Sequence, residues 1–281
     1  MNQRKSKNEQ AFRTARPSCA YLMLAYLMFA VGALVSFAGC GSHSGSVTMA
    51  SRPTLPPAIA SAEPVLLYDG TGTSPTDVAA IESVLGTLAV AYSTADSGRL
   101  NAMSEQQLGG YKLIIVPGGD SIDIGQNLTP SAVSSIRGAV QQYGVHYLGI
   151  CAGAFFGGYS IYNGVDLTGG VSFNFYADEQ KGIHEEPVEI SFPSSGPLDM
   201  YWQDGPELSG WGEVVAKFPD GTAAISEGQS GSGFVIFTGI HAEAPASWRG
   251  SMTFTTPESA DLAYAGSLIE AALSGTPLPH F

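Results

Sequence analysis

The feature that most constrains the fold is a set of short apolar runs in which polar and apolar residues do not alternate. These runs are residues 64–70, 88–94, 111–120 and 145–150. A strand with one face in solvent alternates, whereas a strand buried on both faces does not. The runs therefore predict four strands of a mostly parallel sheet. The expected fold class is α/β, a doubly wound sheet flanked by helices.

Two helices are predicted between these strands. Ser74 caps the first, with Pro75 at its first position and Asp77 three residues after the cap. Thr129 and Pro130 open the second. Apolar residues recur on one face of each helix: Val78, Ile81 and Leu85 in the first, and Val133, Ile136 and Val140 in the second. The segment between residues 94 and 111 is expected to be irregular.

The second half of the chain reads mainly as strands, in "PVEISF", "DMYWQDG", "EVVAKFPDGTAAISE" and "GSGFVIFTGIHAE". Pro219, Asp220 and Gly221 are typical of a hairpin turn. A last helix is predicted from about residue 257 to 273. Because no Pro/Ser-rich linker follows residue 63, residues 64–281 are predicted to form one domain.

The N-terminal 39 residues are predicted to be a signal peptide. Five basic residues precede an uncharged apolar run of 19 residues that ends at Ala38. The following "FAGC" resembles the lipobox of bacterial lipoproteins, in which the cysteine, here Cys40, is lipidated. Phe37 departs from the Leu usual in that family, and the run is long enough for an uncleaved anchor. In both cases we expect a location in the cell envelope, outside the cytoplasm, with residues 40–63 as a tether.

The chain is acidic, with a formal net charge of −13. Residues 1–39 hold five of the 12 basic residues and one of the 25 acidic ones, so the remainder carries seven basic and 24 acidic residues, a net charge of −17. Such a surface repels nucleic acid and anionic lipid head groups, and neither is an expected partner. Solubility alone also accounts for this charge.

The sequence around Cys151, "YLGICAGAFFGG", carries the strongest indication of chemistry. Gly149 and Gly153 flank the cysteine where a strand should end and a helix begin, which predicts a nucleophile elbow. The elbow would present the thiol at the carboxyl edge of the sheet, beside a helix N-terminus that favours thiolate. Cysteines with flanking glycines are also found buried and inert, so other residues must decide the assignment.

His241 is the candidate base for this thiol, with Glu243 as the acid that orients the ring. A surface histidine at a strand end is the simpler alternative. His184, beside Glu185 and Glu186, is a rival base or part of a weak metal site, but this spacing does not define a metal cage, and no metal is expected. His146 begins the strand that ends at Cys151. Strand rise places it about 15 Å from the cysteine, so it is not an expected base.

An acyl-transfer site also needs donors for an oxyanion. The N–H of Ala152 is one candidate, and Gly118 and Gly119 in "VPGGD" offer others because a peptide without a side chain can approach the neighbouring strand. Asp120 could cap this loop, and Gly118 and Asp120 are also candidates for contacts with a substrate. An ordinary tight turn would also contain Gly and Asp.

In their order, "VPGGD", "YLGICAGAFFGG" and "GIHAEAP" resemble the N-terminal domain of biotin-protein ligases, a branch of the triad glutamine amidotransferases. "LLYDGTGTS" and "YWQDGP" add to the resemblance, which spans about residues 64–275. It implies a flavodoxin-like sheet, Cys151 as nucleophile, His241 as base and Glu243 as orienting acid. It implies no cofactor.

Two departures qualify this resemblance. Phe155 stands where glutamine amidotransferases carry the Gln of C-x-G-x-Q, which puts glutamine recognition in doubt, and their H-P-E reads His241-Ala242-Glu243 here. Biotinylation is not expected outside the cytoplasm.

Three functions remain open from the sequence. The first is a cysteine hydrolase or transferase acting on a small-molecule or peptide amide. The second is a non-catalytic binding module that uses aromatic residues, with core packing as the alternative for these rings: Phe155, Phe156, Tyr201 and Trp202. The third is a thiol-based sensor. Protein partners are not indicated.

Overall fold

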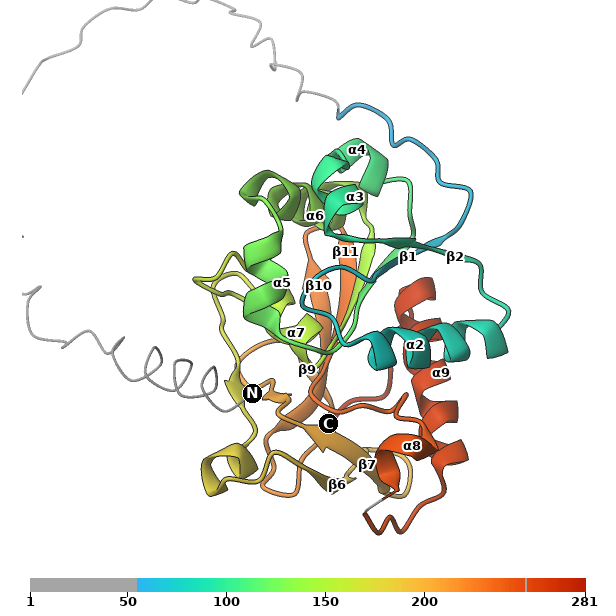
Figure 1. Cartoon of the computed structure of the whole chain (residues 1–281), viewed down its shortest axis with the longest axis vertical. Helices are drawn as coiled ribbons and strands as arrows, with labels where there is room; N and C mark the ends of the chain where they lie inside the picture. Colours follow the sequence, from blue (N-terminus) through green and yellow to red (C-terminus); the bar gives the residue numbers. More distant parts are fainter. Residues whose placement is uncertain (1–54, 251) are drawn as a thin grey trace, which may run out of the picture. The chain divides into compact units, whose positions relative to one another are not determined.

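A computed structural model describes residues 55–250 and 252–281. The predicted signal peptide and Cys40 lie outside the described residues. A seven-stranded sheet with the order β2-β1-β3-β4-β11-β10-β9 forms the centre (Figure 1). Its strands are β1 (Val65–Tyr68), β2 (Tyr92–Ala95), β3 (Leu113–Val116), β4 (His146–Ile150), β9 (Glu213–Lys217), β10 (Ala223–Ser230) and β11 (Gly233–Thr238). The first five strands in this order are parallel, and β10 is antiparallel to both of its neighbours.

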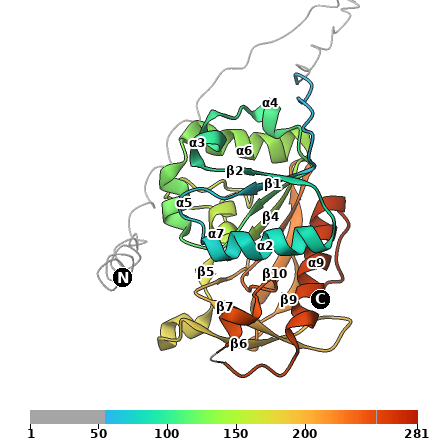
Figure 2. The same ribbon diagram turned by 45° about the vertical axis from the view of Figure 1, so that its right-hand side comes forward.

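Helices cover both faces of the sheet, as the unbroken apolar runs predict (Figures 1 and 2). One face packs against α2 (Pro75–Thr87) and α9 (Glu258–Ser274). The other packs against α3 (Ser97–Ala102), α4 (Glu105–Leu108), α5 (Ser121–Asn127), α6 (Pro130–Tyr143) and α7 (Ala152–Gly157). Consecutive residues of one strand enter different cores: Leu66 joins the second layer and Leu67 the first. The predicted fold class is confirmed.

The predicted N-cap residues, Ser74 and Thr129, precede the first residues of α2 and α6. The Ser74 hydroxyl accepts a bond from the Asp77 N–H at 3.4 Å, and the Thr129 hydroxyl accepts one from the Ala132 N–H at 3.1 Å. Gly144 ends α6 with φ +74°, a left-handed conformation that glycine adopts without a steric penalty. The helix boundaries here follow from local chemistry.

Two predictions about the segment after α2 are wrong. Residues 88–91 are not part of a strand, because α2 continues to Thr87 and Ala89 then turns the chain with φ +52°. The segment after β2 is not irregular, because it forms α3 and α4, capped by Asp96 and Ser104. These helices have six and four residues, too few for a helical period to show in the sequence.

Smaller sheets lie beside the main one. A hairpin pairs β6 (Glu185–Ile190) with β7 (Leu198–Gln203), and β5 (Asn174–Phe175) pairs with β8 (Pro206–Glu207). The 3₁₀ helix η1 (Ala177–Lys181) precedes the hairpin, and α8 (Ala246–Arg249) follows β11. Within the described ranges, no helix combines the length and apolar character that crossing a bilayer requires.

The topology brings four loops to one edge of the sheet. Strands β1, β3, β4 and β11 are parallel and adjacent in this part of the sheet, so their carboxyl ends share that edge. Open α/β sheets bind ligands there. The loops carry the start of α2, the "PGGD" turn, Cys151 and the "GIHAE" segment.

Candidate active site

Cys151 has the backbone conformation of a nucleophile elbow. Its φ of +49° and ψ of −106° lie outside the regions that residues with a side chain favour. A Cβ at Gly153 would lie 1.9 Å from the carbonyl oxygen of Val116, and one at Gly149 would lie 2.5 Å from the oxygen of Gly153. Glycine is required at both positions because the backbones on either side leave no room for a side chain.

The Cys151 side chain is buried in this structure. The residue is 6% exposed, and its Sγ donates a hydrogen bond to the backbone oxygen of Gln203 at 3.5 Å. Gln203 ends β7, so the β6–β7 hairpin lies against the thiol. This contact and the low exposure place the sulfur under the hairpin in this structure.

His241 and Glu243 form a buried pair after β11. Nδ1 of His241 lies 2.7 Å from Oε1 of Glu243, and the two residues are 4% and 2% exposed. The imidazole lies beside the rings of Tyr201 and Trp248, with centroid distances of 6.0 and 5.6 Å. Because Nδ1 is engaged by Glu243, Nε2 is left to face a thiol.

The electrostatics of the pair connect it to Cys151. Burial disfavours the imidazolium, but the charges of Glu243 and Cys151 and the nearby polar groups of Asp77 and Cys151 hold the pKa of His241 well above its usual value. Burial, with the nearby Asp77 charge, raises the pKa of Glu243 against the opposing effect of His241. The effect of Cys151 on this pKa indicates that the two side chains lie near one another. Their roles as nucleophile and base stay a prediction.

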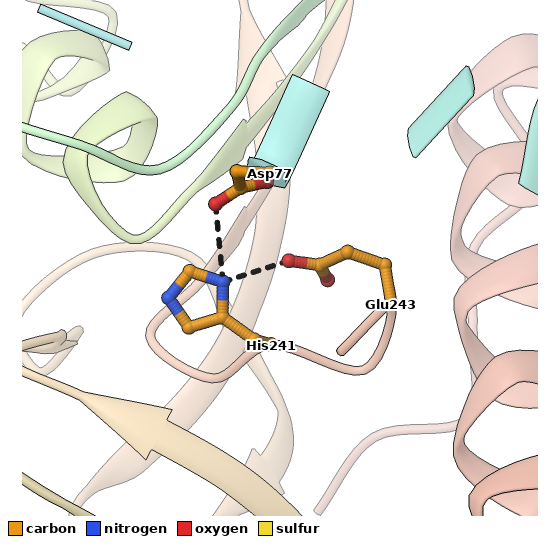
Figure 3. Close-up of side chains that lie close together, drawn as sticks. All are labelled: Asp77, His241 and Glu243. Carbon is orange, nitrogen blue, oxygen red and sulfur yellow. Dashed lines mark hydrogen bonds and ion pairs between the residues drawn. The ribbon is translucent and has the colours of Figure 1, made fainter. Parts of the chain in front are cut away.

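Asp77 is a site residue that the sequence reasoning missed. It is 1% exposed, and its Oδ2 lies 3.3 Å from Nδ1 of His241. Figure 3 shows the Asp77 carboxylate pointing toward the imidazole. The same oxygen accepts the Gly118 N–H at 3.0 Å. The sequence places Asp77 three residues after a helix cap, a position that acidic residues commonly occupy, and this local explanation hid its contact with a distant loop.

The residues predicted to hold an oxyanion have different partners. The Gly118 N–H is taken by Asp77, so Gly118 cannot act as a donor to a ligand. Gly119 is exposed with φ +144°, and within the described part of the chain neither its N–H nor that of Ala152 donates to a protein acceptor. Asp120 caps α5 by accepting the N–H groups of Ile122 and Asp123, which leaves the predicted role in substrate binding without support.

Three aromatic residues that were candidate ligand contacts lie in different surroundings. Trp202 is fully buried, donates its Nε1–H to the Gly205 oxygen at 3.2 Å and packs in the core, so its prediction as a binding residue is wrong. Phe155 is half-buried and packs on Phe175, at a centroid distance of 4.9 Å. Tyr201 is buried against His241 and is part of the site wall.

His146 and His184 lie apart from this arrangement. His146 Nδ1 contacts the backbone oxygen of Ala272 at 2.5 Å. His184 Nδ1 lies 2.8 Å from Glu179 and 2.9 Å from Asp204, rather than beside the carboxylates of the adjacent residues Glu185 and Glu186. Burial, together with a hydrogen bond to Asp204, raises the pKa of Glu179 to about 7.

Among the residues that the structure describes, two groups have ligand atoms close enough together to hold a cation. They are Asp77, His241 and Glu243, which are buried, and Glu179, His184 and Asp204, which are partly exposed; in each the ligand atoms lie within 4.8 Å of one another. In the first group one imidazole nitrogen already faces both carboxylates, which is the geometry of an oriented base.

Two surface cavities lie away from the cysteine. One, of about 500 Å³, follows the β1–α2 loop from Asp69 to Glu82, and the other, of about 340 Å³, lies beside α3 and α4. Neither is lined by Cys151.

Comparison with known proteins agrees with this architecture. Residues 63–184 match the family model described as biotin-protein ligase, N terminal, a segment that contains Asp77, Gly118 and Cys151 and ends before His241. A solved structure described as a glutamine amidotransferase is similar, with a TM-score of 0.51 and 18% identity, covering 66% of this chain and 96% of that chain. The fold is that of the class I glutamine amidotransferases.

A second solved structure, described as a glutamine amido transferase from Methylobacillus flagellatus, aligns with a TM-score of 0.47 and 13% identity. The alignment covers 79% of this chain and 98% of that chain. No curated protein matches the sequence significantly. At 18% identity the first of these structures establishes the glutamine amidotransferase-like fold and leaves the chemistry to the residues of the site.

Proposed function

We propose that this chain is a cysteine-dependent hydrolase or transferase that acts on an amide. Cys151 is the nucleophile, His241 the base and Glu243 the residue that orients the imidazole. The observations that carry the proposal are the elbow conformation of Cys151 and the buried carboxylate of Glu243 on Nδ1 of His241, with Cys151 among the groups that raise the pKa of this histidine. This arrangement activates a nucleophile on several unrelated folds.

The first half of the reaction forms an acyl-enzyme. The Cys151 thiol gives its proton to His241 while the sulfur attacks the amide carbonyl, forming a carbon–sulfur bond. The N–H groups of Gly119 and Ala152 receive the oxyanion, since neither has a protein acceptor among the described residues. The carbon–nitrogen bond then breaks, and His241 returns its proton to the leaving amine.

The second half releases the acyl group. In hydrolysis, His241 removes a proton from water, the hydroxide attacks the thioester, and the carbon–sulfur bond breaks. The proton on His241 then returns to Cys151. An amine in place of water gives transfer instead. Acid–base help of this kind contributes about 10² to 10⁴ in rate.

We propose that glutamine is not the substrate of this site. An amide group at the position of Phe155 would hydrogen-bond a substrate, and the aromatic ring, packed on Phe175, cannot. The Gln203 carbonyl on the thiol also has to move before any acyl group can bind. We therefore propose a small-molecule or peptide amide as the substrate class.

We also propose that the enzyme works at the cell envelope, tethered through a lipid on Cys40. The support is the sequence pattern of a basic stretch, an apolar run and a cysteine. Metabolic labelling with a palmitate analogue tests this: the wild type should be labelled and Cys40→Ser should not. Equal labelling of both, or a mature N-terminus upstream of residue 40, would contradict the lipoprotein assignment.

The catalytic proposal is tested with a panel of amides. Release of ammonia or amine is measured for the full chain, and Cys151→Ala and His241→Gln should each lower turnover at least 100-fold. Ser267→Ala, an exposed position on α9, is a control that should retain the wild-type rate. Equal slow release by wild type and Cys151→Ala would reject an enzyme of this mechanism.

A further inference from the structure

Two buried carboxylates converge on one nitrogen of His241. Glu243 lies 2.7 Å from Nδ1 and Asp77 lies 3.3 Å from it (Figure 3). Nδ1 carries a single hydrogen, which the shorter contact to Glu243 accounts for. The mechanism proposed above therefore uses Glu243 and leaves Asp77, at 1% exposure, without a role.

A structural role as a helix cap does not account for Asp77. In a capping box its carboxylate would bond the backbone N–H of Ser74. That N–H instead donates to the Gly118 oxygen at 2.9 Å, while Asp77 Oδ2 accepts the Gly118 N–H. Oδ1 of Asp77 is buried without a hydrogen-bond partner. A buried carboxylate with an unpaired oxygen costs free energy unless a positive charge lies nearby. His241, which is in contact with Asp77, supplies that charge when its imidazole is protonated.

Asp77 also links the base to the loop that carries an oxyanion donor. A Cβ at Gly118 would lie 2.2 Å from Asp77 Oδ2 and 2.7 Å from His241 Cε1, so this loop approaches both groups as closely as glycine permits. Gly119, the proposed donor, is the next residue. A shift of Asp77 would move the imidazole and this loop together.

We propose that Asp77 is a positioning residue of the amide-cleaving site: its charge supports the His241 imidazolium, and its bond to Gly118 keeps the oxyanion loop in register with the base. This inference rests on the proposed function. The ionisable groups that face the imidazole are Asp77 from α2, Cys151 from the start of α7, Tyr201 from β7 and Glu243 from its own loop. Trp248 of α8 adds an uncharged ring.

Asp77→Asn separates the charge from the shape. The amide oxygen can still accept the Gly118 N–H, but the negative charge beside Nδ1 is lost. Removing an opposite charge at this range shifts a pKa by about one unit or more, so the pKa of His241 should fall by about that amount. The alkylation rate of Cys151 near neutral pH should fall about tenfold with it.

Two readouts on the full chain test this without any substrate. Ring-nitrogen NMR follows the titration of His241, and peptide-resolved mass spectrometry follows iodoacetamide alkylation of Cys151 apart from the other cysteines. Asp123→Asn is the matched control, since Asp123 is also the third residue of a helix with a capped first turn. It should leave both readouts unchanged.

Asp77→Glu retains the charge and should keep the pKa of His241 raised, which guards against a fold lost through the Asn variant. If Asp77→Asn lowers the thermal midpoint but leaves the His241 titration and Cys151 alkylation as in wild type, Asp77 is structural and the inference is wrong. If the two readouts shift but no amide is cleaved by wild type, the support of the His241 imidazolium by Asp77 stands, and the proposed function fails.

Discussion

The backbone N–H of His241 donates to the carbonyl oxygen of Tyr201 at 2.9 Å, an isolated bridge between the β6–β7 hairpin and the loop after β11. The hairpin also supplies the Gln203 oxygen that accepts from Cys151. It therefore contacts both the nucleophile and the base, although it lies outside the main sheet. The hairpin therefore lies against the thiol and the base at the same time.

Substitution of Tyr201 tests how the hairpin supports the base. Its hydroxyl bonds Glu185 and Gln203 at 3.1 and 3.2 Å, while its ring packs on His241 and Trp248. Tyr201→Phe loses only the hydroxyl and should lower the free energy of unfolding by about 1 kcal/mol. Tyr201→Ala should lower it by about 3–5 kcal/mol, because the ring is buried. Urea denaturation distinguishes the two, and equal losses would show that the ring does not support the loop.

The glycines of the elbow give a second prediction. At Gly153 a methyl group would lie 1.9 Å from the Val116 oxygen, which belongs to backbone and cannot move aside. Gly153→Ala should therefore cost more than 3 kcal/mol or prevent folding. Gly86→Ala is the matched control in α2, where nothing lies within 4 Å, and it should stabilise by about 0.5–1 kcal/mol. Similar thermal midpoints for the two variants would contradict the crowded elbow.

The elbow and the His241–Glu243 contact could be predicted from sequence because each depends on residues within one short segment. Gly149 and Gly153 flank the cysteine directly, and His241 and Glu243 are two positions apart in a turn. The sheet could be predicted equally well, since burial on both faces leaves an unbroken apolar run in each strand. In these cases the local pattern and the tertiary structure require the same residues.

Asp77 and Trp202 could not be assigned correctly in this way. Asp77 satisfies the local chemistry of a helix start, and only the adjacency of β1 and β3 brings its carboxylate to Gly118. Trp202 follows Tyr201 on a strand, where neighbouring side chains point to opposite faces, and nothing in the sequence tells which face borders the site. Long-range packing decided both.

The stability of the fold should depend on pH through carboxyl groups whose pKa is raised in the folded state. Burial raises the pKa of Glu179 and of Glu186 to about 7 and that of Asp261 to about 6. A carboxyl group with a raised pKa in the fold stabilises it below its ordinary pKa, and this contribution is lost as pH rises through the folded value. The raised pKa values of His184 and His241 act in the same direction, because the folded state retains their protons to higher pH.

We therefore expect the thermal midpoint to fall as pH rises from about 4.5 to about 7. Differential scanning calorimetry across this range measures it. Glu179→Gln should flatten the dependence, because the amide cannot ionise, while Glu189→Gln, at an exposed position on β6, should not. A midpoint that rises steadily over this interval would show that the neutral carboxyl groups do not govern stability.

The strained backbone of Cys151, which the proposed function requires, should lower the stability of the fold. At φ +49° and ψ −106° a Cβ is unfavourable, and such conformations cost about 1–3 kcal/mol. Cys151→Ala and Cys151→Gly both remove the thiol, but only the glycine removes the Cβ. After the entropic cost of glycine, about 0.5–1 kcal/mol, Cys151→Gly should remain more stable than Cys151→Ala by about 1 kcal/mol. Urea denaturation of the two variants makes the comparison, and both should lack turnover. An alanine variant as stable as the glycine variant would mean that the backbone relaxes once the sulfur is gone, and that the thiol itself holds the elbow in place.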